Sequence, residues 1–210
     1  MTLEEAETII HSLGVASKMP CHTYSTSAKD CQRGGKLHEI EGSVCSHCYA
    51  RRGNFGRPVI QTGLRARAEA MKHPLWSEAM GVVLTAKEHS HYFRWFSSGD
   101  LQNLGDLLKI CDVCKRTPHI KHWLPTHEVG ILGAFKRAGF EYPKNLTVRL
   151  SADMLDKKIP RRLLKSLGVQ GGEVSTTGKH TCPSSTQENM CQTCRLCWHR
   201  SQPIVVYKYH

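Results

Sequence analysis

Four cysteines near the C-terminus have spacings that suit thiolate ligation of a metal centre. Cys191, Cys194 and Cys197 follow one another at two-residue gaps, and Cys182 lies upstream beside Pro183. Three such thiols can turn toward one centre from a single tight loop, and a fourth can close its coordination sphere. Thiolate ligation of this kind suits Zn²⁺ or an iron–sulfur cluster, and C-x2-C-x2-C with a Cys-Pro nearby favours the cluster. The sequence therefore predicts a [4Fe-4S] cluster or a structural zinc ion in a C-terminal cysteine-rich loop, residues 180–201.

A second cysteine-rich loop is expected over residues 18–57, which are rich in Gly, Ser and basic residues and show no clean periodicity. A long irregular loop inside a compact domain needs a reason, and a metal centre can supply one. Cys31, Cys45 and Cys48 form a three-thiolate set that would leave one iron of a [4Fe-4S] cubane open for a substrate or cofactor. Alternatively, Cys21 completes a four-cysteine zinc site.

The spacing of Cys111 and Cys114 resembles half of a zinc site, but both residues fall inside an expected helix. Buried free cysteine is common in helices. A structural role in the core is the prediction for this pair.

Helical and strand-like patterns alternate from residue 58 onward, after a short capped helix that ends near Gly14. Helices are expected over 61–72, 75–89, 104–116, 130–137 and 160–167, and strands over 92–96, 122–128, 146–150, 169–175 and 204–207. This alternation predicts one α/β domain over residues 1–210, in which βα repeats form a parallel sheet that is open or wrapped as a partial barrel.

Polar side chains follow several expected strands at the point where each strand ends. The carboxyl ends of parallel strands are where α/β proteins bind ligands. Asp100 and Glu128 are the candidate catalytic carboxylates, for proton transfer or for holding a polar substrate, and His127 could assist them. The candidates for cofactor binding at the same edge are Ser98, Gly99, Gln102 and Arg149.

The composition is that of a globular protein, with 40% hydrophobic and 22% charged residues, and the net charge of +11 favours an anionic partner. A nucleic acid or nucleotide is the usual candidate, although a basic surface can merely aid solubility. One run interleaves basic and aromatic residues and suits either phosphate contacts with stacking or a solvated helix face: Tyr49, Arg51, Arg52, Phe55, Arg57, Arg65 and Arg67.

The start of the chain lacks the basic and apolar regions of a signal peptide, and no apolar run approaches the length of a membrane span. We therefore expect a cytoplasmic protein with no membrane partner. In a reducing compartment, clustered cysteines are more often metal-binding or catalytic than bridged.

Many short motifs, in order from residue 18 to the end, resemble those of a bacteriophage family, the gene product 88 domain. They include Lys18-Met19-Pro20, Tyr24-Ser25-Thr26-Ser27-Ala28, Cys31, Cys45, Cys48-Tyr49-Ala50, Ser98-Gly99-Asp100-Leu101-Gln102, Trp123-Leu124-Pro125-Thr126, Asn145-Leu146-Thr147-Val148-Arg149, Cys182-Pro183, Cys197-Trp198, Tyr207-Lys208 and His210. The family is similar to radical S-adenosylmethionine proteins in pairing a three-cysteine set with a βα-repeat body. The long gap between Cys31 and Cys45 departs from their usual C-x3-C-x2-C, which leaves binding of S-adenosylmethionine in doubt. Cys21, Cys111 and Cys114 lie outside the family pattern, which supports treating them as non-ligands.

These observations lead to the hypothesis of a phage-type iron–sulfur protein with a radical-enzyme-like body and one or two clusters. If it is an enzyme, the open iron would serve redox or radical chemistry on a nucleotide or nucleic acid. Two other classes stay open. One is a non-catalytic, zinc-stabilised nucleic-acid-binding protein, and the other is a single-cluster electron-transfer or redox-sensing protein with ligands from both ends of the chain.

Overall fold

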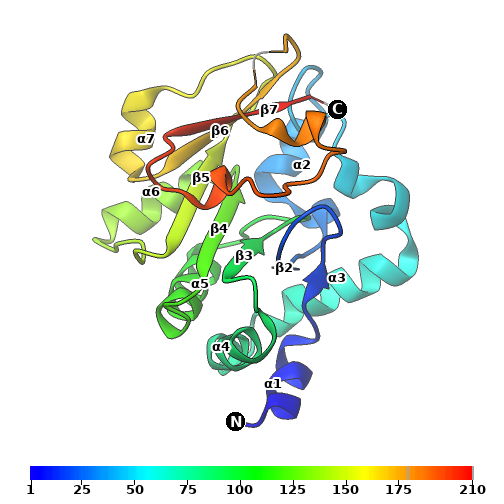
Figure 1. Cartoon of the computed structure of the whole chain (residues 1–210), viewed down its shortest axis with the longest axis vertical. Coiled ribbons are helices and arrows are strands. Elements are labelled where there is room, and N and C mark those ends of the chain that lie inside the picture. The colour runs from blue at the N-terminus through cyan, green and yellow to red at the C-terminus, as the bar shows by residue number, and fades with distance from the viewer. Residues whose placement is uncertain (179, 210) are drawn as a thin grey trace.

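The computed structural model describes residues 1–178 and 180–209, and its strands form one sheet (Figure 1). His210, part of the family-like pattern, lies outside these residues. The strands are β1 (Gly14–Val15), β2 (His22–Tyr24), β3 (Tyr92–Trp95), β4 (Lys121–Thr126), β5 (Leu146–Ser151), β6 (Gln170–Ser175) and β7 (Ile204–Lys208).

The seven strands of the described residues lie side by side in chain order, from β1 to β7. Only β1 runs antiparallel to its neighbour, and every pair from β2 to β7 is parallel. The sheet is open, with β1 and β7 as its edges. This confirms the expected α/β class and the open, mostly parallel form of the sheet.

Helices fill most of the connections between strands. They are α1 (Leu3–Ile10), α2 (Gln32–His38), α3 (Pro58–Ala70), α4 (Trp76–Lys87), α5 (Leu104–Arg116), α6 (Val129–Arg137) and α7 (Arg161–Leu167). α1 begins with a capping box between Thr2 and Glu5, and Pro58 occupies the first turn of α3. The helices and strands expected after residue 58 are all present close to their expected bounds.

The segment 18–57 is more regular than the sequence predicts. It contains β2, α2 and 3₁₀ turns at Ala28–Asp30, Tyr49–Arg51 and Gly53–Gly56. Two adjacent glycines weaken the helical signal of α2. Glycine is favoured at position 34, because a Cβ there would lie only 3.1 Å from the Cβ of Cys31. Close packing against a cysteine therefore overrides local propensity.

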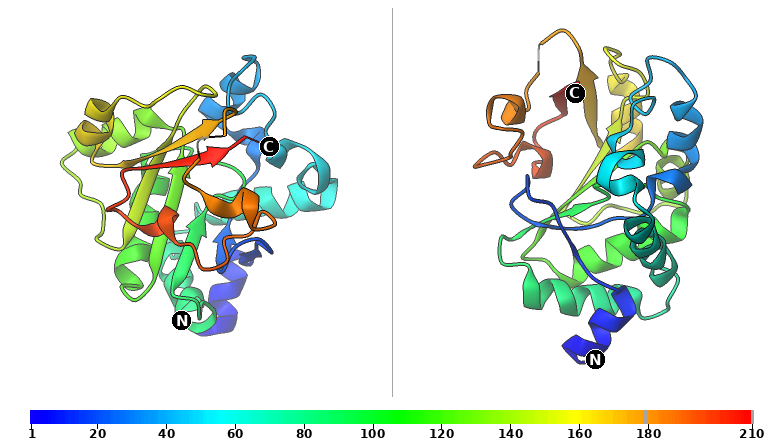
Figure 2. Two further views of the ribbon diagram at one scale, coloured as in Figure 1. Left: turned by 45° about the horizontal axis from the view of Figure 1, so that its top comes forward. Right: turned by 90° about the vertical axis from the view of Figure 1, so that its right-hand side faces the viewer.

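The two faces of the sheet are covered differently. Phe93, Trp95 and Leu124 point into the main apolar core, which α1 and α4 to α7 complete. Alternate residues point the other way, and there Trp123 packs against Trp198 of the cysteine-rich segment between β6 and β7. In the right-hand view of Figure 2 this segment (orange) and α2 (blue) lie on opposite sides of the sheet. The segment thus replaces a helix as the crossover to β7.

The core contains three polar or reactive side chains from α5 and β4. Cys111 and Cys114 are buried there, as expected for structural cysteines. His122 is fully buried, with its ring stacked on Trp95, and its Nε2 lies 2.9 Å from the hydroxyl of Thr117. No helix in residues 1–178 or 180–209 is long and apolar enough to cross a membrane.

The buried imidazole of His122 should make stability depend on pH. Burial lowers its pKa from 6.5 to about 3, helped by the nearby charge of His119. Between these values the unfolded chain binds a proton that the folded chain does not, so the free energy of unfolding falls as the pH drops through this window. Each pKa unit is worth about 1.4 kcal/mol. We expect His122→Phe to flatten this dependence by a few kcal/mol, measured by urea unfolding across the window.

The matched control for this change is the exposed His89→Gln. It should leave the slope of stability against pH unchanged. If His122→Phe kept the full slope of the parent protein, another group would be responsible for the acid sensitivity.

Candidate functional site

The first candidate site lies where β3, β4 and β5 end, and helix α2 supplies its first thiol. Cys31 is the residue before α2, and Glu128 fixes this helix by accepting a hydrogen bond from the backbone N–H of Arg33 at 2.8 Å. The sulfurs of Cys31 and Cys45 each lie 3.7 Å from the position of a Cβ on Gly34. The two sulfurs are therefore no farther apart than twice that distance.

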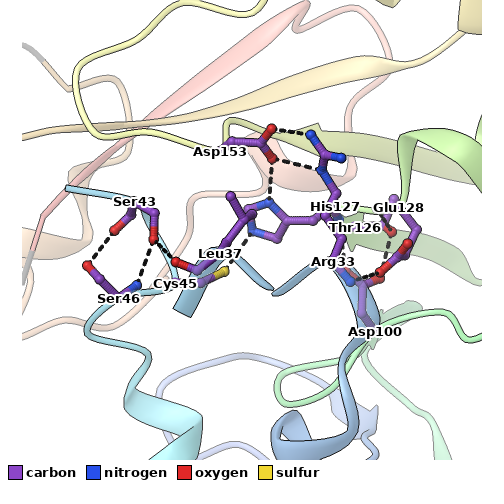
Figure 3. A network of polar contacts seen from close by, with 10 residues as sticks. All are labelled: Arg33, Leu37, Ser43, Cys45, Ser46, Asp100, Thr126, His127, Glu128 and Asp153. Atoms are coloured by element: carbon purple, nitrogen blue, oxygen red, sulfur yellow. Dashed lines mark hydrogen bonds and ion pairs between the residues drawn. The ribbon is translucent and has the colours of Figure 1, made fainter. Parts of the chain in front are cut away.

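A short loop after α2 carries Cys45 and Cys48. The hydroxyl of Ser43 donates to the carbonyl of Leu37 at the end of α2, and it accepts from the backbone N–H of Ser46 (Figure 3). The N–H of Val44 donates to the carbonyl of Asp153, beyond the end of β5, at 2.8 Å. The loop is therefore attached to both the helix and the sheet, which holds the second and third thiols beside the first.

A chain of polar contacts runs from Cys45 through His127 to Asp153 (Figure 3). His127 Nε2 lies 3.7 Å from the Cys45 sulfur, and its Nδ1 lies 3.5 Å from a carboxylate oxygen of Asp153. The Nε and one terminal nitrogen of Arg33 donate to the two oxygens of the same carboxylate, with Nε at 3.1 Å from Oδ1. The imidazole of His127 is therefore held at both ring nitrogens, by Cys45 at Nε2 and by Asp153 at Nδ1.

The electrostatics of this chain favour a protonated imidazole. Burial lowers the pKa of His127, but the Asp153 hydrogen bond and the nearby Cys45 and Asp100 outweigh it and raise the pKa to about 10. The hydrogen bond from His127, followed by Arg33, holds the pKa of Asp153 below its ordinary value, against a smaller opposing effect of burial. His127 can therefore donate a proton or a hydrogen bond toward the sulfur.

Asp100 is buried at the centre of the same strand ends. Its carboxylate accepts from the backbone N–H of Leu101, the hydroxyl of Thr126 and the backbone N–H of His127, at 2.8, 2.6 and 2.8 Å. Burial raises the pKa of this carboxyl, and these hydrogen bonds offset the effect only in part. In this structure Asp100 holds the start of the His127 segment in place.

Ser98, Gly99 and Gln102 lie beside Asp100 and shape the turn after β3. Gly99 has a φ of +84°, and a Cβ there would lie 2.1 Å from the hydroxyl oxygen of Thr26. Gln102 donates to the carbonyl of Asp100 and accepts from Gln32 at the start of α2. The hydroxyls of Ser98 and Thr26 are buried without a hydrogen-bond partner among the described residues. Their hydrogen-bonding capacity is therefore unused within these residues.

The thiols of this site lie in an environment that disfavours thiolates. Burial raises the pKa of Cys31, and the negative charges of Asp100, Cys48, Cys45 and Glu128 raise it further. Burial also raises the pKa of Cys48. Deprotonation of this set would need a cationic centre, because thiolates and carboxylates would otherwise repel one another.

The distances between the ligand side chains bear on the kind of centre that they could hold. Within residues 1–178 and 180–209, no three His, Cys, Asp or Glu side chains are grouped closely enough to hold one metal ion. A cubane cluster is wider than an ion, so its ligands stand farther apart. The sulfurs of Cys31 and Cys45, at most twice 3.7 Å apart, are close enough to share a cubane.

The second candidate site is formed by the cysteine-rich C-terminal segment, and Arg149 of β5 holds that segment in place. This buried guanidinium donates from Nε to the carbonyl of Cys197, and its two terminal nitrogens donate to four more carbonyls. The four are those of Gly171, Gln202, Leu196 and His199, at 2.8 to 3.2 Å. All five N–H groups of Arg149 are therefore engaged by backbone, which differs from the cofactor contact expected from the sequence.

The thiols of the second site gather on the face of the sheet opposite the helices. Cys197 is buried with its sulfur 3.3 Å from the hydroxyl of Tyr207, and Cys182 packs in the same apolar cluster. Cys191 donates its N–H to the carbonyl of Lys18 at 2.9 Å, and Cys194 donates to the carbonyl of Cys191. The loop thus closes onto the N-terminal segment as well as onto β7.

Cys21 lies in this second group, although the sequence favoured treating it as a non-ligand. It is buried in the apolar cluster that contains Cys182 and Cys197, and burial raises its pKa to about 12. The charge of Cys191 adds to that rise, which places the two thiols near each other. No local pattern in the sequence indicates this, because Cys21 and Met19 join the cluster only through packing in the folded chain.

Two arginines lie beside the second group of thiols. Arg94 packs over the ring of Trp123, and Arg195 packs over Tyr92. Both lower the pKa values of Cys21 and Cys191, although burial outweighs them. Among the described residues, the Nε of Arg94 and the Nε1 of Trp123 are buried without hydrogen-bond partners. Unpartnered donors and cations next to thiols suit an anionic thiolate centre.

These features define an α/β protein with an open, mostly parallel sheet, one group of thiols where strands end and a second group on one face of the sheet. The chain belongs to the gene product 88 family of phage gene products, whose model matches residues 2–200. No curated protein and no solved structure matches the chain.

Loss of the Arg149 guanidinium should loosen the C-terminal segment. We expect Arg149→Met to destabilise the protein by about 3 kcal/mol or more, because carbonyls are left without donors in a buried site. Urea unfolding measures the loss, and limited proteolysis should show earlier cleavage within residues 180–203. The exposed Arg161→Met is the control for charge and should change neither result. Equal stability of the two variants would contradict the role assigned to Arg149.

Proposed function

We propose that this protein binds a [4Fe-4S] cluster through Cys31, Cys45 and Cys48, with one iron left open for a substrate or cofactor. The observation that carries the proposal is the grouping of these thiols with Asp100, His127 and Glu128 where parallel strands end. We further propose a redox or radical enzyme with a radical-SAM-like body. The chain order of the parallel strands supports this. S-adenosylmethionine is left out of the proposal because of the long gap between Cys31 and Cys45.

Charge compensation supports a cationic centre at these residues. Cys31 is surrounded by groups that are negative when ionised, and its thiol is largely buried. A metal centre converts such thiols to thiolates and neutralises part of their charge. A bound cluster would supply electrons, or a Lewis-acidic iron, to a molecule at the strand ends.

The residues of the chain would act on such a centre by positioning and hydrogen bonding. Glu128 fixes the start of α2 and therefore the direction of Cys31. His127 faces the sulfur of Cys45, and a hydrogen bond to a cluster thiolate is one of the ways in which proteins tune reduction potentials. Asp153 and Arg33 set the orientation of that imidazole.

We assign a second centre, a cluster or a structural zinc, to Cys182, Cys191, Cys194 and Cys197. Cys21 lies within the same group of thiols and is a fifth potential ligand. Because α2, which follows Cys31, lies on the opposite side of the sheet from the C-terminal segment, two separate centres are favoured over one cluster with ligands from both segments (Figure 2).

Metal analysis of anaerobically purified protein tests both assignments. Two cubane clusters correspond to about eight irons per chain. We expect Cys45→Ser to lose about four of these with the matching sulfide and visible absorbance, and Cys194→Ser to lose only the metal of the second centre. Cys111→Ala, in the core, should keep the full metal content. Undiminished iron in Cys45→Ser would contradict the first site, and a colourless protein with stoichiometric zinc would leave the zinc-stabilised binding protein as the function.

A nucleic-acid or nucleotide substrate is the second part of the proposal, and an exposed aromatic side chain beside Cys48 supports it. Tyr49 is 54% exposed, and Phe55 packs edge-on against it. Arg51, Arg52 and Arg57 lie in the same short segment. A base stacked on the Tyr49 ring and phosphates bound by the arginines would place a single-stranded nucleic acid next to the first thiol site.

Binding of single-stranded DNA or RNA should therefore be salt-dependent. We expect the logarithm of the association constant to fall linearly with the logarithm of salt concentration, and Tyr49→Ala to weaken binding by about 1 kcal/mol or more. Fluorescence anisotropy with a labelled oligonucleotide measures both. The control is Val59→Ala, an exposed apolar residue in the next helix. A flat salt response would contradict this substrate class.

A further inference from the structure

A cavity of about 210 Å³ opens beside the first thiol site, between the end of β5, the start of α6 and the segment that leads to α7. None of the roles described above uses this space. Its inner wall is apolar and formed by Val129, Leu150, Ala152, Met154, Ile159 and Leu163. This wall suits a small apolar or aromatic group.

The remaining lining residues give the cavity a positive charge. They include three basic residues, Arg33, Lys157 and Lys158, and one acidic residue, Asp153. Arg33 and Asp153 neutralise each other through their two contacts. Apart from His127, the two exposed lysines therefore leave a net charge of about +2 for an occupant to meet.

His127 connects the cavity with the thiols. Its ring lines the cavity, while its Nε2 faces the sulfur of Cys45 at 3.7 Å. Its Nδ1 is buried and faces the Asp153 carboxylate, at 3.5 Å from Oδ1. A molecule in the cavity would thus touch the residue that touches Cys45.

We propose that this cavity binds a small organic anion, with an aromatic or apolar body against the inner wall and a phosphate or carboxylate group against Lys157 and Lys158. The volume is below the range of drug-sized ligand pockets, so the occupant is about the size of one ring with its acidic group. That this molecule is also the one acted on rests on the proposed function, whereas the binding itself does not.

Phenyl phosphate and phenylacetate are suitable probes, because each combines one ring with one acidic group. Phenol and inorganic phosphate represent the two halves of the first probe. Calorimetric titration into the purified full-length protein should show saturable binding of at least one of the ring-bearing anions, with both halves at least about tenfold weaker. The tighter of the two anions identifies the acidic group.

The double variant K157A/K158A should raise the Kd of the tighter probe about tenfold, the effect of two partly screened ion pairs. The matched control is K115A/K144A, which removes the same charge from exposed lysines outside the cavity lining and should leave the Kd unchanged. Equal weakening by both pairs, binding of inorganic phosphate as tight as that of phenyl phosphate, or no saturation below about 10 mM would overturn the proposal.

Cys45→Ser separates this inference from the proposed function. Its sulfur faces His127 but is not part of the cavity lining. Unchanged probe affinity in a variant that has lost its iron supports an independent anion site. Unchanged iron with intact probe binding would also support the cavity, while contradicting the cluster assignment. Loss of saturable binding in the parent protein overturns the cavity whatever the iron content.

Discussion

A single buried cation, the guanidinium of Arg149, joins the sheet to the segment that covers its second face. A parallel sheet needs cover on both faces, and helices cover only one face here. The other is closed by residues 176–178 and 180–203, which contain little regular structure and therefore many backbone carbonyls in need of donors. Arg149 supplies five N–H groups at the centre of this segment. Burial lowers the pKa of the Arg149 guanidinium, and every N–H group of this guanidinium donates a hydrogen bond.

At the strand ends, too, a single buried charged group binds several hydrogen-bond partners and so holds several segments in place. Asp100 accepts from three groups and in doing so fixes the backbone from which His127 and Glu128 project. Glu128 then fixes α2 and Cys31, and His127 faces Cys45. The carboxylates of Asp100 and Glu128 therefore act mainly by positioning other residues of the site. The protonated imidazole is the group placed to exchange a proton with a sulfur or with an occupant of the cavity.

Local sequence patterns predict the helices and strands and the residues that lie at the strand ends, because both depend on residues close together in the sequence. Period and turn residues predict the helices and strands after residue 58, and polar residues after β3 and β4 predict Asp100 and Glu128 at the strand ends. Contacts between distant segments leave no such signal. Arg33 meets Glu128 and Asp153, 95 and 120 residues away, and nothing near Arg33 in the sequence indicates either partner.

Two residues show where a sequence signal existed but pointed elsewhere. Arg149 is the one charged residue of β5, and a buried arginine must be paired. Its position near a strand end suggested a ligand, but its partners are carbonyls that approach from 22 to 53 residues away. Cys21 lacks the regular spacing of the other thiols, yet packing places it among them.

The arrangement of the two thiol groups constrains how they could work together. One group lies at the strand ends beside a cavity and an exposed tyrosine, where a molecule from solution can approach. The other is packed with Trp198, Tyr92 and Tyr207 and contacts both the segment before β2 and strand β7. A centre in the first position is open to chemistry, whereas a centre in the second joins Lys18–Cys21 to the crossover before β7. Metal loss at the second centre would therefore release the cover of one sheet face and act on the first site through the fold.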